Sequence, residues 1–494
     1  MKFKTNKFIF LLLVIFIYSC EKTKVINNNS SDDEDIKKII ILYTNDEHGW
    51  IEKSEYSNGA AEMMGLWREN EGYDGDESYL ILSGGDNWTG PAISTWFEGE
   101  STVDVMNAME YDASAIGNHE FDFTVDGLEE RIMQANFPYL SANIREKASG
   151  NIPGFATPYI ILDIDDVMVG IIGLTTITTP WSTFPDHVAD YDFIDYFSAL
   201  EEVVPQVKQV GAELLIVIAH ICYSEIVDLA PILINMGISV IGGGHCHAGL
   251  ISQIISSAHG ELAAIKTNSY MQSYSKVEIS YDMIEKEVVS MEPSGHLNES
   301  GNPDQAVANV LSYWRDQTDA ELSEIIGYTD NEISVRSNAM HNMVADSWLY
   351  NYPDADIAMT NAGGIRQSIP AGSITKEVII GVLPFQNFII ELQLTGAQVI
   401  NCTEYEDMIY GGMTTVGGYF LSDGTPIDDN TTYSVLTTDF LYAQDVNIIP
   451  FSQYDASPLT TSMNYHQPTI DWITSRNTSS SNPLDNYLDD VARR

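Results

Sequence analysis

The residues best suited to chemistry in this chain are Asp, Asn and His side chains in five short clusters. Carboxylate and amide oxygens and imidazole nitrogens are the ligands that divalent metal ions accept. Five of the 10 histidines of the 494-residue chain fall in these clusters, whereas chance placement would scatter them. The clusters are Asn45-Asp46-Glu47-His48-Gly49, Gly84-Gly85-Asp86-Asn87, Gly117-Asn118-His119-Glu120-Phe121-Asp122, Ala219-His220 and Gly243-Gly244-His245-Cys246-His247. Together they predict a metal site.

Each cluster follows a short apolar run that is typical of a buried strand. The runs span residues 39–42, 79–82, 113–116, 214–218 and 238–241. In open α/β sheets, ligands bind beyond the carboxyl ends of the strands. We therefore expect the five strand ends to deliver the clusters to one rim, where glycines let the backbone turn sharply.

The order of these motifs resembles the calcineurin-like metallophosphoesterase superfamily. Two later motifs, Asn361-Ala362-Gly363-Gly364-Ile365-Arg366 and Leu383-Pro384-Phe385-Gln386-Asn387, resemble the C-terminal domain of the bacterial 5′-nucleotidase and UDP-sugar hydrolase family. The resemblance runs from about residue 38 to about residue 450. It implies a phosphoesterase with two divalent metal ions, such as zinc, manganese or cobalt.

The resemblance also implies roles for the clustered residues. One ion is held by Asp46, His48 and His247, the other by Asn118, His220 and His245, and Asp86 bridges them. His119 and Asp122 match the family's catalytic dyad, in which the imidazole stabilises charge on the phosphoryl group and the carboxylate orients it. Glu120 and Phe121, between these two, are assigned to structure.

The second half should select the substrate. The resemblance makes Phe385 and Phe440 a pair of rings that can sandwich a nucleobase, while Arg366 offers a fork to anionic oxygens. Two departures put 5′-nucleotide specificity in doubt. Asp445 stands one position early for a family Asp and lacks its flanking glycines, and Ser334 replaces an Arg, with Arg336 the nearest basic residue. The expected substrate-binding set is Asn361, Arg366, Phe385, Asn387, Phe440 and Asp445.

The fold expected is α/β, with a layered metallophosphoesterase domain joined by a helix to an α+β substrate-binding domain. Apolar strands alternate with helical stretches up to about residue 292, and apolar residues recur at helical spacing between residues 304 and 326. The expected divisions are a lipoprotein signal (1–19), an acidic tether (20–36), the metal domain (37–298), the linker helix (299–326) and the substrate domain (327–494).

The first residues predict export. Lys2, Lys4 and Lys7 precede an apolar run at 8–17, which is a secretory signal too short to span a membrane. Cys20 stands where a bacterial lipoprotein is lipidated, although an ordinary signal with an incidental cysteine is also compatible. We expect a lipid-anchored protein of the cell envelope, on the outer membrane or cell surface, facing the periplasm or the exterior.

The net charge limits the classes of binding partner, and the number of cysteines limits the possible disulfides. A net charge of −48 argues against nucleic acid binding through a basic face. With Cys20 lipidated, Cys222, Cys246 and Cys402 remain, and an odd set is no disulfide framework. A bridge between Cys222 and Cys246 is possible, but two small buried residues are favoured. The sequence predicts no particular oligomeric state.

Three functions remain open. The leading one is a two-metal phosphohydrolase acting on extracellular or periplasmic nucleotides. The same centre could act instead on nucleotide sugars, cyclic nucleotides or a non-nucleotide ester. A surface binding lipoprotein without catalysis is disfavoured, because every ligand and both dyad residues are present.

Overall fold

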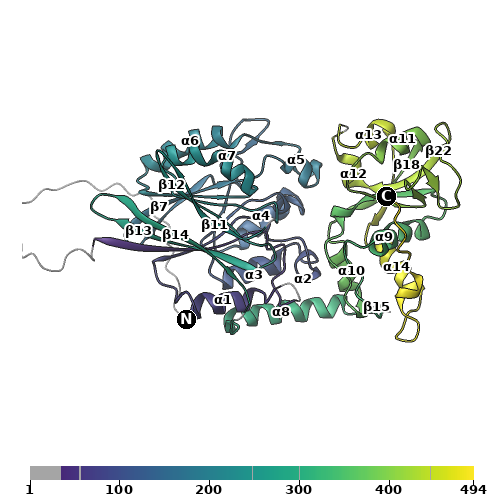
Figure 1. Ribbon diagram of the computed structural model, residues 1–494, viewed down its shortest axis with the longest axis horizontal. Coiled ribbons are helices and arrows are strands. Elements are labelled where there is room, and N and C mark those ends of the chain that lie inside the picture. The colour runs from purple at the N-terminus through teal and green to yellow at the C-terminus, as the bar shows by residue number, and fades with distance from the viewer. Residues whose placement is uncertain (1–34, 55–56, 248, 300, 446) are drawn as a thin grey trace, which may run out of the picture.

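The computed structural model describes residues 35–54, 57–247, 249–299, 301–445 and 447–494. The expected signal, the expected lipidation site Cys20 and most of the expected acidic tether lie outside these residues. The chain forms two lobes, with residues up to β14 in one and residues from β15 onward in the other, and α8 (Gln305–Leu322) runs between them (Figure 1). Among the described residues, no helix has the length and apolar character to cross a membrane.

The first lobe contains two six-stranded sheets. In one, the strand order is β14 (Glu287–Leu297), β13 (Ser273–Asp282), β1 (Ile36–Thr44), β2 (Tyr79–Ser83), β3 (Ala113–Ala115) and β4 (Tyr139–Leu140). In the other, it is β11 (Ile251–Ser257), β12 (Gly260–Lys266), β10 (Val240–Gly242), β9 (Leu214–Ala219), β7 (Val167–Leu174) and β6 (Tyr159–Ile164). Strands β1 to β4 are parallel to one another, as are β7, β9 and β10.

Alternating apolar side chains stack these sheets into four layers. In β1, Ile39 and Ile41 face the second sheet, while Ile40 and Leu42 face the helices on the other side. This is the period of two that a strand imposes. Helices α1 (Ala60–Glu69), α3 (Glu100–Ala108) and α8 cover the first sheet, and α6 (Tyr196–Gln209) and α7 (Tyr223–Asn235) cover the second (Figure 1). The shorter helices of this lobe are α2 (Ala92–Thr95), α4 (Thr124–Gln134) and α5 (Thr179–Ser182).

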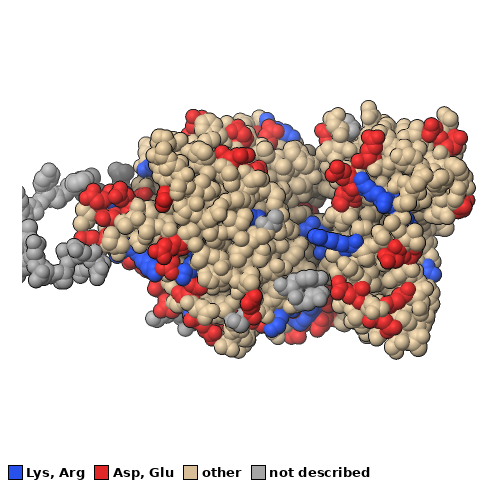
Figure 2. Space-filling model, viewed as in Figure 1, with Lys and Arg blue, Asp and Glu red and all other residues tan. Residues whose placement is uncertain are grey.

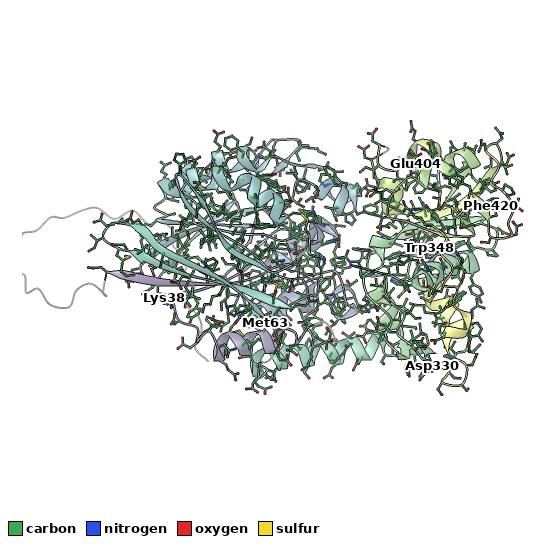
Figure 3. All side chains as sticks on the ribbon, viewed as in Figure 1. Lys38, Met63, Asp330, Trp348, Glu404 and Phe420 are labelled. Atoms are coloured by element: carbon green, nitrogen blue, oxygen red, sulfur yellow. A yellow bond between two sulfur atoms is a disulfide. The ribbon has the colours of Figure 1, made fainter. Side chains whose placement is uncertain are left out.

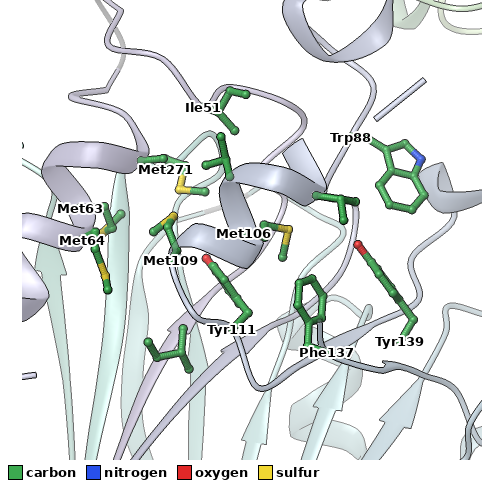
Figure 4. Packing of buried hydrophobic residues seen from close by; sticks show 14 of the residues in the cluster. Ile51, Met63, Met64, Trp88, Met106, Met109, Tyr111, Phe137, Tyr139 and Met271 are labelled. Atoms are coloured by element: carbon green, nitrogen blue, oxygen red, sulfur yellow. The ribbon is translucent and has the colours of Figure 1, made fainter. Parts of the chain in front are cut away.

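Methionine and aromatic side chains fill the layer beneath α1 and α3. Met63, Met64 and Met106 are fully buried there, beside Tyr111 and Phe137 (Figure 4). Methionine adapts to irregular gaps between rings of different shape. This packing fixes the first sheet from which three of the five polar clusters extend.

The second lobe is built on a five-stranded sheet. The strand order is β19 (Met408–Gly411), β16 (Ile357–Asn361), β22 (Thr432–Thr438), β18 (Phe388–Thr395) and β23 (Leu459–Asn464). One face packs on α9 (Asn338–Asn351), α10 (Lys376–Val382) and α14 (Gln467–Ser475), around the fully buried Trp348 (Figure 3). The other face packs on α11 (Gly396–Cys402), α12 (Asp439–Ala443) and α13 (Phe451–Tyr454). A smaller sheet pairs β15 (Ile325–Thr329) with β17 (Gly372–Thr375).

The connecting helix is shorter than the 304–326 stretch that its apolar spacing predicted. Asp304 caps its start, accepting hydrogen bonds from the N–H groups of Ala306 and Val307 at 2.9 and 3.2 Å. It ends at Leu322, because residues 325 and 326 already belong to β15. Leu322 packs with Ala92 of the first lobe and Ile380 of the second, so the end of this helix lies at the junction of the lobes.

Candidate active site

The five polar clusters meet at one edge of the first lobe, but they come from two sheets and not from one. Three follow β1, β2 and β3 of the first sheet, and two follow β9 and β10 of the second. The sequence pattern predicted a common rim because parallel strands end at the same edge. The face-to-face stacking of two sheets, which the pattern did not reveal, brings the two halves of the site together.

The side chains form three groups of potential metal ligands, with the ligand atoms of each group within 4.8 Å of one another. Asp46, His48 and His247 make one group, and Asp86, His220 and His245 make another. The third group, His48, Asp86 and His119, overlaps both. His48 Nε2 lies 3.7 Å and His220 Nε2 lies 2.9 Å from the same oxygen of Asp86. Asp86 therefore stands between the groups, as a ligand shared by two ions would.

Among the proposed donors, the buried side-chain oxygen of Asn118 has no hydrogen-bond partner in the described part of the chain. The Asn118 amide nitrogen donates to the Ser182 carbonyl at 2.9 Å. Buried polar atoms are almost always paired in proteins. An unpaired amide oxygen close to buried carboxylates and imidazoles fits a divalent metal ion.

The backbone around these donors is held in an uncommon conformation. Asp46, His48, Asp86, His245 and His247 all have positive φ angles, between 45° and 69°. Such residues cost free energy and gather at functional sites. Close packing enforces the geometry, since a Cβ atom at Gly84 would overlap the Tyr43 hydroxyl and one at Gly117 would overlap the Asp86 carboxylate.

Glu120 holds the loop that carries Asp86. One carboxylate oxygen accepts from the N–H groups of Asp86 and Gly117 at 2.9 and 2.6 Å, and the other accepts from Asn87 at 2.7 Å. Burial, with the nearby charge of Asp86, raises the pKa of Glu120 to about 7. Phe121 packs into the core of the first lobe. Both residues point away from the donors, in keeping with the structural role expected for them.

The charged side chains of the donor set shift one another's pKa values. Burial alone would raise the pKa of Asp86, but His220 and His119 outweigh it and hold the pKa well below its ordinary value. Burial would likewise lower the pKa of His220, yet Asp86 and Asp46 raise it to about 10. Buried carboxylates thus bind whatever positive charge is nearby, and a divalent cation is a stronger source of it than an imidazolium.

His119 lies beside the donors and is oriented by Asp122. Its Nδ1 is 2.7 Å from Asp122 Oδ2, and the other Asp122 oxygen accepts from the Thr183 hydroxyl at 2.9 Å. Burial would lower the pKa of His119, but Asp122 and Asp86 outweigh it and raise the pKa above its ordinary value. The pair therefore has the arrangement of an imidazolium held in place by a carboxylate.

A cavity of about 370 Å³ lies between the lobes and opens on this pair. That volume suits a small organic molecule. His119 and Asp122 line it from the first lobe, and the expected substrate residues Asn361, Arg366, Phe385, Asn387 and Phe440 line it from the second. The Phe385 ring stacks on His119 with 5.7 Å between ring centroids.

Arg366 also lines a second, larger cavity of about 640 Å³ on the side of His247. Its guanidinium lies over the Phe385 ring at 5.8 Å. Arg336, the nearest basic residue to the family's missing Arg, lines this second cavity, whereas Ser334 does not. Figure 2 shows basic side chains near the junction of the lobes and acidic ones spread over the visible face.

Asp445 is not among the residues that line the cavity. It is exposed and holds its own turn, because its carboxylate accepts from the Asn447 N–H at 2.8 Å. The cavity instead contains Asp439, which the sequence analysis missed although it directly precedes Phe440. Burial raises the pKa of Asp439 to about 6, and its carboxylate accepts from the Phe388 N–H at 3.0 Å. His187 and Phe184 of the first lobe were also missed, since no motif marks them.

Cys222 and Cys246 are joined by a disulfide, with their Cα atoms 5.2 Å apart. The expectation of two small buried residues was therefore wrong. Cys246 is exposed and Cys222 is half-buried. Both follow strand ends of neighbouring strands, which brings them within bonding reach. Cys402 is a free, buried thiol in the second lobe.

The shared position of Asp86 predicts that Asp86→Asn will weaken metal binding more than any other single ligand change. The substitution removes a charge that faces both groups, so we expect at least about tenfold weaker binding. Equilibrium dialysis against Mn²⁺, with metal counted by mass spectrometry, measures this. Asp122→Asn is the matched control and should keep its metal. Equal metal content in the two variants would contradict the assignment.

Comparison with known proteins shows which proteins this chain is similar to. Residues 320–410 match the family described as 5′-nucleotidase, C-terminal domain. The 5′-nucleotidases of Bos taurus and Homo sapiens are 29% and 28% identical over 433 residues, covering 78% of this chain and 74% of each relative. The solved structure of a 5′-nucleotidase precursor from Thermus thermophilus superposes with a TM-score of 0.77 at 21% identity, covering 92% of this chain and 98% of that one.

A sulfate thiohydrolase from Thermus thermophilus shares the fold as well, with a TM-score of 0.68 at 15% identity, covering 89% of this chain and 94% of that one. The fold alone therefore does not decide the substrate. The matched C-terminal domain, the sequence similarity to 5′-nucleotidases and the donor set agree with one another. The chain is therefore similar to the 5′-nucleotidases in sequence over most of its length and in its two-domain fold, and residues 320–410 match their C-terminal domain.

Proposed function

We propose that this protein is a metal-dependent phosphohydrolase that removes phosphate from nucleotides at the cell envelope. One observation carries the proposal. The His119–Asp122 pair, which adjoins the candidate metal donors, lines a cavity whose other wall holds Arg366, Phe385 and Phe440. Residues suited to phosphate chemistry and residues suited to binding a nucleobase thus lie next to one another in one site.

The metal centre is proposed to hold two divalent ions, such as zinc, manganese or cobalt, since oxygen and imidazole donors suit all of these. Asp46, His48 and His247 would hold one ion, and Asn118, His220 and His245 the other, with Asp86 shared. Two ions at such a centre supply a metal-activated water and neutralise phosphoryl oxygens.

The chain's own residues supply the remaining steps. His119 is placed beside the donors with its Nδ1 held by Asp122, so its Nε2 proton is free to face a phosphoryl oxygen. The carboxylates of Asp122 and Asp86 raise the pKa of His119 above its ordinary value, which favours the protonated ring. A positioned cation that meets developing negative charge stabilises the transition state. Arg366, at the meeting of the two cavities, would bind further phosphate oxygens.

The lobes are proposed to act as separate domains with boundaries near residues 298 and 327. The candidate metal donors lie in the first lobe. His119 and Asp122 of the first lobe and the rings of Phe385 and Phe440 of the second line one shared cavity. A planar base can stack on such rings regardless of its identity, while Asn361 and Asn387 offer hydrogen bonds. Across the lobes, Gln386 donates to Glu98 at 3.0 Å and Arg315 pairs with Glu377 at 2.8 Å.

The location proposed is the cell envelope, through a lipid on Cys20 after removal of the signal at 1–19. The basic residues and apolar run at the N-terminus support it, and the acidic tether at 20–36 would separate the lobes from the outer membrane. These residues lie outside the described part of the chain. The sequence favours no oligomeric state.

Hydrolysis of a panel of phosphate compounds tests the proposal. We expect phosphate release from nucleoside 5′-phosphates, loss of turnover after chelation, and recovery with Mn²⁺, Co²⁺ or Zn²⁺. Nucleotide sugars, cyclic nucleotides and non-nucleotide esters belong in the same panel, because they are the alternative substrates. Full activity of metal-free protein would refute the metal centre, and a metal-loaded protein that hydrolyses nothing would favour a binding function.

The dyad predicts that His119→Ala will lower kcat by about 10²–10³ without loss of metal, the usual effect of removing one transition-state stabiliser. Steady-state kinetics and metal content are measured on the same sample. His259→Ala is the control, since that histidine is exposed on a turn. A His119→Ala protein that lacks one ion would show that His119 is a ligand instead.

The cavity predicts that Phe385→Ala will weaken the use of a nucleotide by about 1–3 kcal/mol. The loss should appear mainly in KM, because a stacked base is bound alike in the ground and transition states. A small aryl phosphate has no base and should react nearly as before. Phe420→Ala, on the far side of the second lobe (Figure 3), controls for losing a ring. Equal losses on both substrates would mean that Phe385 is a packing residue.

A further inference from the structure

The disulfide joins two loops that both carry metal donors. His220 and then Cys222 follow the end of β9, and Cys246 lies between His245 and His247 after the end of β10. The two strands are parallel neighbours, with Ile218 beside Gly242 in the register. The bond therefore joins two cysteines that are 24 positions apart in the sequence, beside the candidate metal donors.

The two ends of this bond differ in how firmly they are held. Cys222 is the N-cap residue of α7, and its N–H donates to the Glu225 carboxylate at 2.9 Å. Just before it, His220 is fully buried, and its Nδ1 lies 2.8 Å from the Gly84 carbonyl oxygen. This end belongs to a strand and a 13-residue helix and is fixed by ordinary secondary structure.

The other end lies in an irregular and exposed loop. Cys246 is exposed, and both neighbouring histidines have positive φ angles, 69° at His245 and 46° at His247. Such a conformation is unfavourable for residues with a Cβ atom and persists only where the surroundings enforce it. In this segment, the His245 N–H donates to the Asp46 carboxylate at 3.0 Å and the Cys246 N–H donates to the Gly244 carbonyl at 2.8 Å.

The two histidines on this loop serve different groups of donors. His247 belongs with Asp46 and His48, and His245 belongs with Asp86 and His220. A loop that relaxed toward ordinary φ angles would withdraw one donor from each group. Among the described residues, the bond to Cys222 is the only covalent tie between this loop and the rest of the centre.

We propose that the Cys222–Cys246 disulfide is a positioning element for the metal centre. It ties the strained His245–His247 loop to the start of α7 and so raises the affinity for metal and slows metal release. The inference rests on the proposed metal centre, and it assigns to these cysteines no contact with substrate or metal. A cross-link of this kind acts by reducing the conformations open to the loop when metal is absent.

The test compares Mn²⁺ binding by the full chain and by the double variant Cys222→Ser/Cys246→Ser. Loss of partners that orient metal ligands costs about 10–100-fold in affinity, and we expect a Kd for Mn²⁺ raised by that factor, with faster release to excess EDTA. At saturating Mn²⁺ the hydrolysis rate should return to near the wild-type value, because all seven donors remain. Cys402→Ser, which removes a buried thiol from the other lobe, should leave Mn²⁺ binding unchanged.

A second measurement keeps the inference testable if the double variant does not fold. Native wild-type protein is treated with a phosphine in water. The phosphine gives two electrons to the S–S bond, and one water molecule supplies the oxygen of the phosphine oxide and the protons of the two thiols. After the reagent is removed, Mn²⁺ affinity should fall as in the variant. Unchanged affinity after reduction, or free thiols at Cys222 and Cys246 in non-reducing peptide maps, would overturn the inference while leaving the proposed function intact. Wild-type protein that binds no Mn²⁺ would overturn both.

Discussion

The burial of two carboxylates, Asp46 and Asp86, is the constraint on which this structure depends. Both are almost fully removed from water, at 0% and 2% exposure. Taking an ionised carboxylate out of water is costly unless a compensating charge is supplied. The surrounding imidazoles supply part of it, as the raised pKa of His220 records. A divalent cation would supply it fully, so metal binding and the stability of this edge of the fold are linked.

The same constraint explains the local architecture. Donors can approach a common point only if the backbone turns tightly after each strand, which accounts for the glycines and for the left-handed residues at five donor positions. Glu120 holds one of these turns by hydrogen bonds, and the disulfide holds another by a covalent bond. The stacked sheets beneath provide a rigid base, because their packed interior does not deform easily.

The overall acidity of the chain works against an anionic substrate, and the site compensates locally. At a net charge of −48, long-range steering of a nucleotide is unfavourable, although salt screens it beyond about 8–10 Å. Arg366 and Arg336 place positive charge between the lobes, and metal ions bound by the nearby donors would add to it. The division of the site between two lobes also means that chemistry and recognition can vary separately, which fits a fold that serves more than one reaction.

The sequence by itself determined the strands, the polar clusters after them and the pairing of His119 with Asp122. These are local features, since a run of apolar residues and the turn that follows it are read from neighbouring positions. The resemblance of their motifs also implied that Phe385 and Phe440 lie together, and both line one cavity. The linker helix was found but extended too far, because apolar residues of β15 continue its pattern.

Only the tertiary structure decided what depends on distant segments meeting. Two stacked sheets, and not one, carry the donors. Cys222 and Cys246 are bridged because β9 and β10 are neighbours. Asp439, at the start of α12, lines the cavity, whereas Asp445 lies beyond the end of that helix and accepts a hydrogen bond from the Asn447 N–H. Periodicity in a sequence indicates which face of a helix or strand is buried. It does not indicate which other helix or sheet packs against that face.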